Sequence, residues 1–555
     1  MPSKHIVVVG ASAAGLRCAA RLRRRQPGWN ITVVDARQEI SVAACGLPYV
    51  LSGDIQRAEA LRETADGTLR DAAYFSDVKG VTVRCGLRAT RLDVQARTLH
   101  VEGAGGAEAL PYDELVLATG SSAKRLAGLK PHARVHVFHT LDDLRPLTQG
   151  LQKGQLSSVA IVGAGLVGVE LSEAFGALWG AEVHLFEHAA QPLPQILDDE
   201  VGALVRAVLV ANDVQVHTGA AVQAIEPGDT SVRLQAGSVE VEVDAVVLAL
   251  GVLPLVELAR EAGADIGPTG ALVVDQRLHT TLDGVWAAGD CIEVHHAVTG
   301  APCHLPLGSL ANRQGRVLAD ILAGDDESFG PVVGSVACKV FDRNLACAGI
   351  TLAQARALGL QARAVWTSAP DRADYWPESK EIHLQLSYEV GTERLLGVQI
   401  FGEGEVAKRV DVATTYLTRK ATLRELEALE HAYAPPYAPA LDPLAVAAMV
   451  ARDQERGCVA CSPLASVEGA VLDVRREDEQ QARGSGFESL AIPLASLRSR
   501  HAELRDRTWT VLCERGTRSA EAVRQLADDG IQARYVGGGL HWLLASGRVS
   551  ANPGD

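Results

Sequence analysis

Apolar residues in the N-terminal half of the chain occur in short unbroken segments, and a glycine-rich turn follows the first of them. Residues 5–9 (HIVVV) are apolar without alternation, as in a strand buried on both faces. The turn GASAAG (10–15) follows, then the helical stretch LRCAARLRRR (16–25), then the run NITVVD, which ends at Asp35. This order of strand, tight turn, helix and strand predicts a Rossmann-type α/β unit.

The same order returns about 150 residues later, in SVAIVGAGLVGVELSEAFGALWGAEVHLFE. Glycines in such a turn let the backbone approach a pyrophosphate on the helix N-terminus, and the acidic residue that ends the second strand accepts ribose hydroxyls. Two such motifs predict two dinucleotide sites. The first site contains Gly10, Ser12, Ala13, Ala14, Gly15 and Asp35, and the second contains Gly163, Gly165, Gly168 and Glu187.

Two more strand ends fit the first dinucleotide site. ELVLATGS (114–121) has the pattern of a crossover strand, and it contributes Ala118, Thr119 and Gly120. GVWAAGDCIEV (284–294) places Gly289 and Asp290 after an apolar strand, where a carboxylate can hold a sugar-alcohol chain.

The pattern changes at about residue 331. The segments that follow predict antiparallel strands with short turns, then a helix at 405–419 and a proline-rich end at 433–443 (YAPPYAPALDP). A further helix leads to a last unit of about 100 residues, which contains TVLCERGTRSAEAVRQLADDGI.

Composition narrows the class of protein. A chain of 555 residues is too long for one hydrophobic core, and 47% apolar with 22% charged residues is typical of soluble globular proteins. The net charge of −15 argues against nucleic acid or an anionic membrane as partner, and no apolar run of 18 residues predicts a membrane span. Ten cysteines and an N-terminus that enters a strand at once, without room for a signal peptide, predict a reducing cytoplasm.

Eight motifs in a fixed order then identify a family: GASAAG, ACGLPY, LATGS, VGAGLVGVE, AAGDC, LANRQGR, CKVFD and YAPPY. Residues 1 to about 450 resemble the single-cysteine branch of the flavin-dependent pyridine nucleotide-disulfide reductases, especially coenzyme A disulfide reductases and NADH-dependent persulfide reductases. Residues 456–555 resemble a rhodanese domain, with LDVR upstream of the loop CERGTRS.

The resemblance implies an α/β protein with two Rossmann-like domains, an α+β dimerisation domain and a C-terminal α/β rhodanese domain. The expected boundaries are 1–150 with 280–330 for FAD, 151–279 for NAD(P)H, 331–445 for dimerisation, and 446–555 for a linker helix with the rhodanese domain. The expected state is a homodimer.

The resemblance also implies the small molecules. FAD belongs in the first site and NADH in the second, where Glu187 should repel the 2′-phosphate of NADPH, although His188 leaves NADPH open. Coenzyme A is expected as substrate or bound carrier. Its nucleotide end is expected near Arg17, Arg21 and Arg24 on the first helix, with Asn312 and Arg316; the alternative for the basic run 21–25 is a solvated helix face.

Cys45, in ACGLPY, has no second cysteine two to five residues away, so its sulfur partner must come from outside or from oxygen chemistry. A thiol has a pKa near 8.5, and we expect a helix N-terminus and the flavin to lower that of Cys45. Reduced nicotinamide would then supply the electrons, through the flavin, to a mixed disulfide or persulfide on Cys45. By alignment with the family, Tyr375 and Tyr433 line the substrate cleft and donate to the leaving thiolate.

The C-terminal loop predicts a second sulfur site. Cys513 ends a strand, and its loop can direct several amides at one sulfur, while Arg515 and Arg518 would attract thiosulfate or a sulfonated leaving group. Cys458 and Cys461 form a C-x-x-C without a second pair at zinc spacing, so no metal site is expected and their role stays open.

Three functions remain. The favoured one is a flavin-dependent NAD(P)H reductase of persulfides, polysulfides or coenzyme A disulfide, with sulfane sulfur carried on Cys513. An NADH oxidase or peroxidase would cycle through a sulfenic acid, but Ser12 stands where such relatives have histidine. The third is a redox-sensing flavoprotein scaffold.

Overall fold

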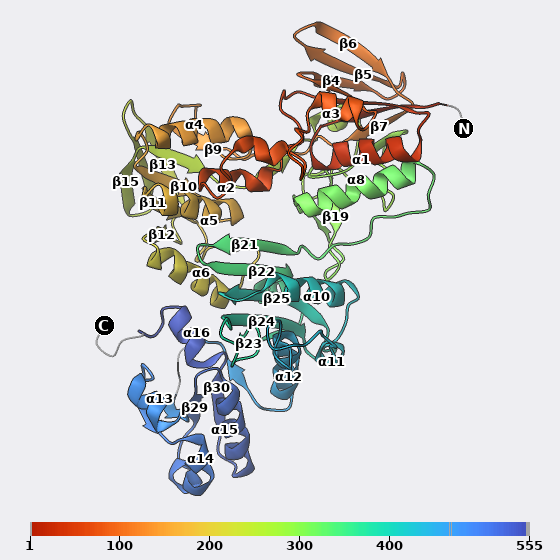
Figure 1. Cartoon of the computed structure of the whole chain (residues 1–555). Coiled ribbons are helices and arrows are strands. Elements are labelled where there is room, and N and C mark those ends of the chain that lie inside the picture. Colours follow the sequence, from red (N-terminus) through yellow and green to blue (C-terminus); the bar gives the residue numbers. More distant parts are fainter. Residues whose placement is uncertain (1–2, 466, 468, 551–555) are drawn as a thin grey trace.

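The computed structural model describes residues 3–465, 467 and 469–550, and its first domain is a parallel sheet of order β18-β7-β1-β2-β3. Its strands are β1 (His5–Val9), β2 (Asn30–Asp35), β3 (Thr82–Cys85), β7 (Glu114–Leu117) and β18 (Val285–Ala287). Helices α1 (Ala13–Arg25) and α8 (Gly308–Leu322) pack side by side on this domain (Figure 1). An antiparallel sheet of β4 (Arg88–Asp93), β5 (Thr98–Gly103) and β6 (Gly106–Pro111) completes it.

The second domain repeats the parallel arrangement in the order β12-β11-β10-β16-β9. Its strands are β9 (Val135–Val137), β10 (Ser158–Val162), β11 (Glu182–Phe186), β12 (Gln215–His217) and β16 (Ala245–Leu248), and its helices are α4 (Leu141–Gln152), α5 (Leu166–Glu173) and α6 (Asp199–Ala211). A small antiparallel sheet joins β13 (Val222–Pro227), β14 (Val232–Ala236) and β15 (Val239–Val243).

Strand pairing moves both expected boundaries of this domain. β9 pairs with β16, so the second domain begins near residue 135 and not at 151. At the other end, β17 (Val252–Pro254) pairs with β8 (Ser121–Ala123), and the helix α7 (Glu257–Glu261) packs in the core of the first domain. The chain therefore returns to the first domain near residue 255, before the expected 280. Short edge strands carry too little pattern for the sequence to show this.

The third domain is an antiparallel sheet of order β21-β22-β25-β24-β23. Its strands are β21 (Val336–Val340), β22 (Arg343–Gly349), β23 (Ala362–Pro370), β24 (Glu381–Glu389) and β25 (Leu395–Gly402), with helices α9 (Leu352–Ala357), α10 (Ala407–Thr418) and α11 (Leu423–Glu427). Every residue of β25 is buried. The expected linker helix, α12 (Pro443–Glu455), packs on β23 and β24, so it belongs to this domain.

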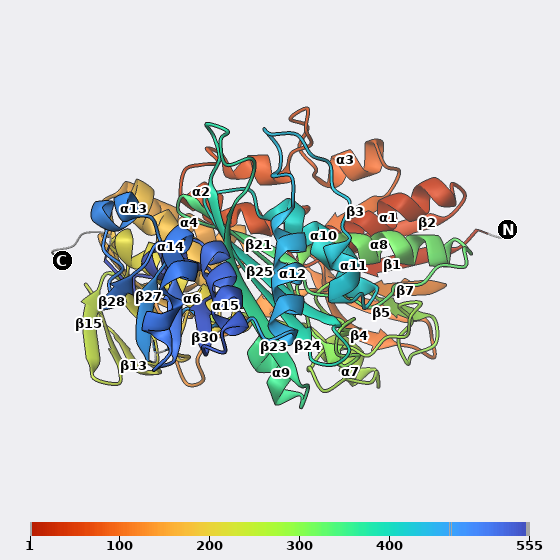
Figure 2. The same ribbon diagram turned by 90° about the horizontal axis from the view of Figure 1, so that it is seen from below.

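The C-terminal unit has its own parallel sheet, in the order β26-β30-β29-β27-β28. Its strands are β26 (Ala460–Cys461), β27 (Ala470–Asp473), β28 (Ser489–Ala491), β29 (Trp509–Leu512) and β30 (Ala533–Val536), and its helices are α13 (Glu477–Ala482), α14 (Leu494–Leu497), α15 (Thr517–Asp528) and α16 (Gly539–Ala545). The unit lies on the side of the second domain and away from the first (Figure 2). Its α16 contacts β23 and α6. Within the described ranges, no helix is long and apolar enough to cross a membrane.

Candidate active site

The first glycine turn is closed tightly by backbone contacts. Gly10 has φ +112°, and a Cβ built there would lie 2.0 Å from the carbonyl oxygen of Ala118. A Cβ on Gly15 would lie 2.0 Å from the oxygen of Gly10. Ser12, the N-cap of α1, is followed by Ala13 and Ala14, whose first-turn amides have no intrahelical acceptors. This turn presents the helix N-terminus as a phosphate site.

Asp35 lies at the end of β2 beside this turn and is almost fully buried. Its carboxylate accepts hydrogen bonds from the amides of Ala11 (2.7 Å) and Arg37 (2.8 Å). The acid is thus fixed against the glycine turn, in the position that receives a ribose in this kind of unit.

The two other predicted strand ends converge on the same turn. Gly289 follows β18, and a Cβ there would lie 3.2 Å from Cβ of Ala14. The Asp290 carboxylate accepts from Ser121 Oγ (3.0 Å), and Thr119, beside Gly120, donates to Leu255 O (2.6 Å). These residues fit a dinucleotide that lies across the carboxyl ends of β1, β7 and β18.

The second glycine turn has the same geometry. Cβ atoms on Gly163 and Gly168 would lie 2.4 Å from Ala249 O and 1.9 Å from Gly163 O, whereas one on Gly165 would meet nothing within 4 Å. Glu187 is buried and accepts from the amides of Ala164 (3.0 Å) and Ala189 (2.9 Å). Open space at the middle glycine is what a pyrophosphate needs.

Cys45 lies in a single 3₁₀ turn, Ala44–Gly46, just before α2 (Leu47–Leu51), and is exposed to solvent. Its Sγ is 3.8 Å from a Cβ built on Gly308, the first residue of α8. All ten cysteines are free thiols. Cys18, on α1 of the same domain, is fully buried, and burial raises its pKa to about 12.

The surroundings of Cys45 correct one expectation. Partial loss of hydration and the carboxylates of Glu170 and Asp290 raise the pKa of Cys45, whereas the sequence predicted a lowered pKa. The reason is tertiary: Glu170 comes from α5 in the second domain, more than a hundred residues away in sequence.

Glu170 is a site residue that the sequence analysis missed. Tyr49 Oη donates to its carboxylate (3.2 Å), and Cys338 Sγ of β21 lies 4.0 Å from it. Burial raises the pKa of Glu170 to about 7. The only sequence signal was its place at the end of the motif VGAGLVGVE, two residues after Gly168. Three domains thus meet beside Cys45.

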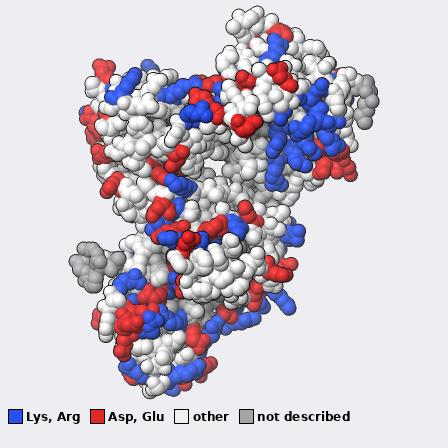
Figure 3. Space-filling model, viewed as in Figure 1, with Lys and Arg blue, Asp and Glu red and all other residues white. Residues whose placement is uncertain are grey.

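The predicted coenzyme A residues separate into two groups. Arg17, Arg24, Asn312 and Arg316 are exposed on the neighbouring helices α1 and α8, and Figure 3 shows a basic patch over these helices. Arg21 is different, because its Nε lies 2.8 Å from both carboxylate oxygens of Asp320 on α8. Its charge is already neutralised, so it is not a free phosphate ligand.

Tyr375 and Tyr433 lie together in the third domain. Tyr375 follows β23, Tyr433 precedes α12, and both side chains are exposed. A hydrogen bond with Tyr433 raises the pKa of Tyr375. The two tyrosines therefore contact each other within one chain.

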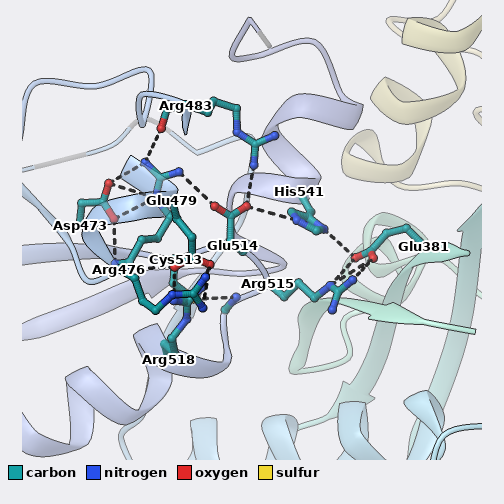
Figure 4. Close-up of polar contacts among 12 residues, drawn as sticks. Glu381, Asp473, Arg476, Glu479, Arg483, Cys513, Glu514, Arg515, Arg518 and His541 are labelled. Carbon is teal, nitrogen blue, oxygen red and sulfur yellow. Dashed lines mark hydrogen bonds and ion pairs between the residues drawn. The ribbon is translucent and has the colours of Figure 1, made fainter. Parts of the chain in front are cut away.

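Cys513 follows β29 in the C-terminal unit and is buried. Its Sγ accepts from the amides of Gly516 (3.2 Å) and Ser519 (3.4 Å), and the loop leads into α15. Leu540 N, in α16, donates to Cys513 O (2.9 Å), which ties the loop to that helix. A pocket of about 690 Å³ opens beside the thiol (Figure 4).

The arginines beside Cys513 differ from expectation. Arg518 pairs with Glu479 (Nη2 to Oε1, 2.9 Å), and Arg515 pairs with Glu381 of β24 (2.8 Å). Both guanidinium groups are therefore neutralised by carboxylates that the sequence analysis did not identify. Figure 4 shows Arg515 reaching out of the C-terminal unit to the third domain.

His541, on α16, is a further residue that the sequence did not reveal. Its Nδ1 lies 3.0 Å from Glu381 Oε1 and its Nε2 lies 3.2 Å from Glu514 Oε2. Although burial opposes the charge, these two carboxylates raise the pKa of His541 to about 9.

The C-x-x-C pair forms no metal site. Cys458 Sγ points to Ala520 O (3.6 Å) and Cys461 Sγ to Tyr535 O (3.1 Å). Among the described residues, no group of three or more His, Cys, Asp and Glu side chains is arranged to hold a metal ion.

Two Rossmann domains, each with a tight glycine turn, a lone cysteine beside a carboxylate of the second domain and a third domain built on an antiparallel sheet define a dinucleotide-dependent oxidoreductase. Family models agree: "Pyridine nucleotide-disulphide oxidoreductase" matches residues 4–308, and its "dimerisation domain" matches 335–445. The chain belongs to the pyridine nucleotide-disulphide oxidoreductase family, whose cofactors are FAD and NAD(P)H.

Individual relatives are similar over long stretches. The "NAD(P)H sulfur oxidoreductase (CoA-dependent)" of Pyrococcus abyssi is 32% identical over 451 residues, covering 80% of this chain and 98% of that protein. A NAD-dependent persulfide reductase from A. fulgidus superposes with a TM-score of 0.93 at 36% identity, over 97% of this chain and 99% of the other. The Bacillus anthracis protein "CoADR-RHD" gives 0.89 at 29% identity, over 98% of both chains. The last two matches include the C-terminal unit, and the predicted fold of the first three domains is confirmed.

Proposed function

We propose that this chain is a homodimeric flavoenzyme that uses NAD(P)H to reduce thiol persulfides, polysulfides or coenzyme A disulfide at Cys45. The observation that carries the proposal is the isolation of Cys45. It is exposed, beside the N-terminus of α8, whereas Cys18 is fully buried. A single accessible thiol at this place has to form its disulfide or persulfide with an incoming molecule.

The names of the relatives support the same reaction class. They include a CoA-dependent NAD(P)H sulfur oxidoreductase and an NAD-dependent persulfide reductase. The balanced reaction for a persulfide is R–S–SH + NAD(P)H + H⁺ → R–SH + H₂S + NAD(P)⁺. For coenzyme A disulfide, the two products are thiols.

The residues around Cys45 have different roles in the proposed reaction. The first glycine turn, with Asp35 and Asp290, would hold FAD, which would supply the electron transfer between nicotinamide and sulfur. Cys45 forms the bond to the substrate sulfur, and the N-terminal dipole of α8 acts against the rise in its pKa that burial, Glu170 and Asp290 cause. Glu170, with a pKa of about 7 and a hydrogen bond to Tyr49, holds a proton that the leaving thiolate requires.

Substrate and nicotinamide are selected by charge. The exposed Arg17, Arg24 and Arg316 provide guanidinium groups for the phosphates of coenzyme A. Tyr375 and Tyr433 border the substrate cleft across the dimer. Glu187 favours NADH, because its buried carboxylate, held against the second glycine turn, would repel a 2′-phosphate.

We further propose that the C-terminal unit is a rhodanese domain that carries sulfane sulfur on Cys513. Two amides at the N-terminus of α15 donate to its Sγ, an arrangement that stabilises a thiolate or persulfide. Fusion of a sulfur carrier to a reductase makes a persulfide the natural substrate class.

Two variants of the full-length protein test the proposal. Cys45→Ser is expected to abolish NADH-dependent sulfide release from coenzyme A persulfide, whereas Cys513→Ser retains NADH-dependent reduction of coenzyme A disulfide and loses loading of sulfur. Mass spectrometry of both proteins would identify what is attached to each cysteine. Full sulfide release by Cys45→Ser would refute the assignment, and NADH consumption at full rate with oxygen alone would favour an NADH oxidase.

A further inference from the structure

The pocket beside Cys513 has walls that are charged but internally neutralised. Four cationic side chains border it: Arg483, Arg515, Arg518 and His541. Glu479 binds Arg518, and Glu514 binds Arg483 (2.6 Å). Figure 4 shows these pairs arranged around the thiol.

The remaining two cations, Arg515 and His541, share a partner outside the C-terminal unit, and His541 also contacts Glu514 within it. Glu381 is the first residue of β24, in the third domain. Its carboxylate receives Nε and Nη2 of Arg515 at 3.1 and 2.8 Å, and lies 3.0 Å from Nδ1 of His541. Asp374, also in the third domain, adds a contact to Arg515 at 3.1 Å. A sulfur site of the C-terminal unit is thus completed by a carboxylate from another domain.

The neutralisation of Arg515 and His541 affects which sulfur donors the pocket can bind, because donors differ in charge. Thiosulfate is a dianion, and sulfite leaves when its outer sulfur is transferred. A thiosulfate site therefore requires uncompensated positive charge close to the thiol. A thiol persulfide approaches neutral or with one negative charge, and its organic part needs volume. A pocket of about 690 Å³ is in the range of sites for organic ligands, far larger than a small inorganic anion needs.

We infer that Glu381 is a specificity-determining residue of the Cys513 site: by binding Arg515 and His541 it makes the pocket selective for organic thiol persulfides over thiosulfate. The inference rests on the proposed role of Cys513 as a sulfur carrier. In the favoured reaction, the Cys513 thiolate attacks the outer sulfur of R–S–SH. A new S–S bond forms between Cys513 and that outer sulfur, so that Cys513 becomes a persulfide. The S–S bond of the donor breaks, and its electron pair leaves on R–S⁻; no net oxidation occurs.

The test compares two donors on the full-length enzyme. Cys513 is loaded from glutathione persulfide or from thiosulfate, and the transferred sulfur is released to cyanide and measured as thiocyanate. The wild type is expected to prefer the persulfide in kcat/KM. Glu381→Gln, which leaves Arg515 with the exposed Asp374 as its remaining carboxylate contact, is expected to raise the ratio of thiosulfate to persulfide kcat/KM by about tenfold, because the positive charge of Arg515 is then less compensated when the dianion approaches.

Matched variants separate this effect from a structural one. Glu403→Gln removes a carboxylate whose partners are Arg343 and Lys380, outside the pocket, and should leave the ratio unchanged. In the double variant Glu381→Gln with Arg515→Gln, the ratio should return to the wild-type value. Retained reduction of coenzyme A disulfide at Cys45 would show that each variant is folded.

The outcomes are distinct. A ratio that stays unchanged in Glu381→Gln, or a wild type that uses thiosulfate as well as the persulfide, would overturn the inference and leave the carrier role of Cys513 intact. Absence of any added sulfur on Cys513 with both donors, read by mass spectrometry, would overturn the carrier role and this inference together.

Discussion

His541 joins the C-terminal unit to the third domain through an ion bridge whose strength depends on pH. Its ring lies between Glu381 and Glu514, 3.0 and 3.2 Å from their carboxylate oxygens. The informative perturbation is His541→Gln, which keeps a polar side chain of similar reach but cannot carry a charge.

The magnitude follows from the change in pKa. The pKa of His541 rises from 6.5 to about 9 in the folded protein. At about 1.4 kcal/mol per pKa unit, this corresponds to an upper value of about 3 kcal/mol for the stability contributed by the charged ring. Because the folded pKa is the higher one, this contribution is complete below pH 6.5 and is lost as the pH rises through about 9.

Unfolding in guanidinium chloride, followed by tryptophan fluorescence, measures this contribution, since Trp509 and Trp542 are buried in the C-terminal unit. In the wild type, the free energy of unfolding of this unit should fall by up to about 3 kcal/mol between pH 6 and pH 10. His541→Gln should remove most of that slope, and His188→Gln, an exposed histidine in the second domain, should not. Equal slopes in the wild type and His541→Gln would refute the reasoning.

Three further changes test other parts of the structure. Glu170→Gln removes a carboxylate that raises the pKa of Cys45, so alkylation of Cys45 by iodoacetamide at neutral pH should become roughly twofold or more faster; an unchanged rate would contradict the assignment. Arg409, on α10, forms a buried ion pair with Asp442, the N-cap residue of α12. Arg409→Met leaves this carboxylate unpaired and should lower the free energy of unfolding of the third domain by about 3–5 kcal/mol, measured by chemical unfolding. Gly165→Ala should fold normally and raise the KM for NADH, whereas Gly168→Ala, with a Cβ 1.9 Å from a carbonyl oxygen, should lower the melting temperature; equal effects of the two would count against this geometry.

Much of the fold was accessible from local pattern. The unbroken apolar runs, the glycine turns at Gly10 and Gly163 and the acids Asp35 and Glu187 predict two Rossmann units, and the structure places each acid against its own turn. These features lie within about 25 residues of each other, so local backbone geometry decides them. The domain boundaries did not follow from pattern, because β9 is a three-residue strand whose place depends on pairing with β16.

Cys45 and Cys513 stand out in the sequence as candidate sulfur sites, since each lies in a motif with a fixed local setting. Their electrostatic surroundings were not, because Glu170 reaches Cys45 from α5 and Glu381 reaches Arg515 from β24. Sequence by itself therefore determined the glycine turns and singled out the two thiols that we propose carry the chemistry. Only the packing of domains determined which of their charges are free and which are already neutralised, because electrostatic energy depends on distances between side chains that the chain order leaves unspecified.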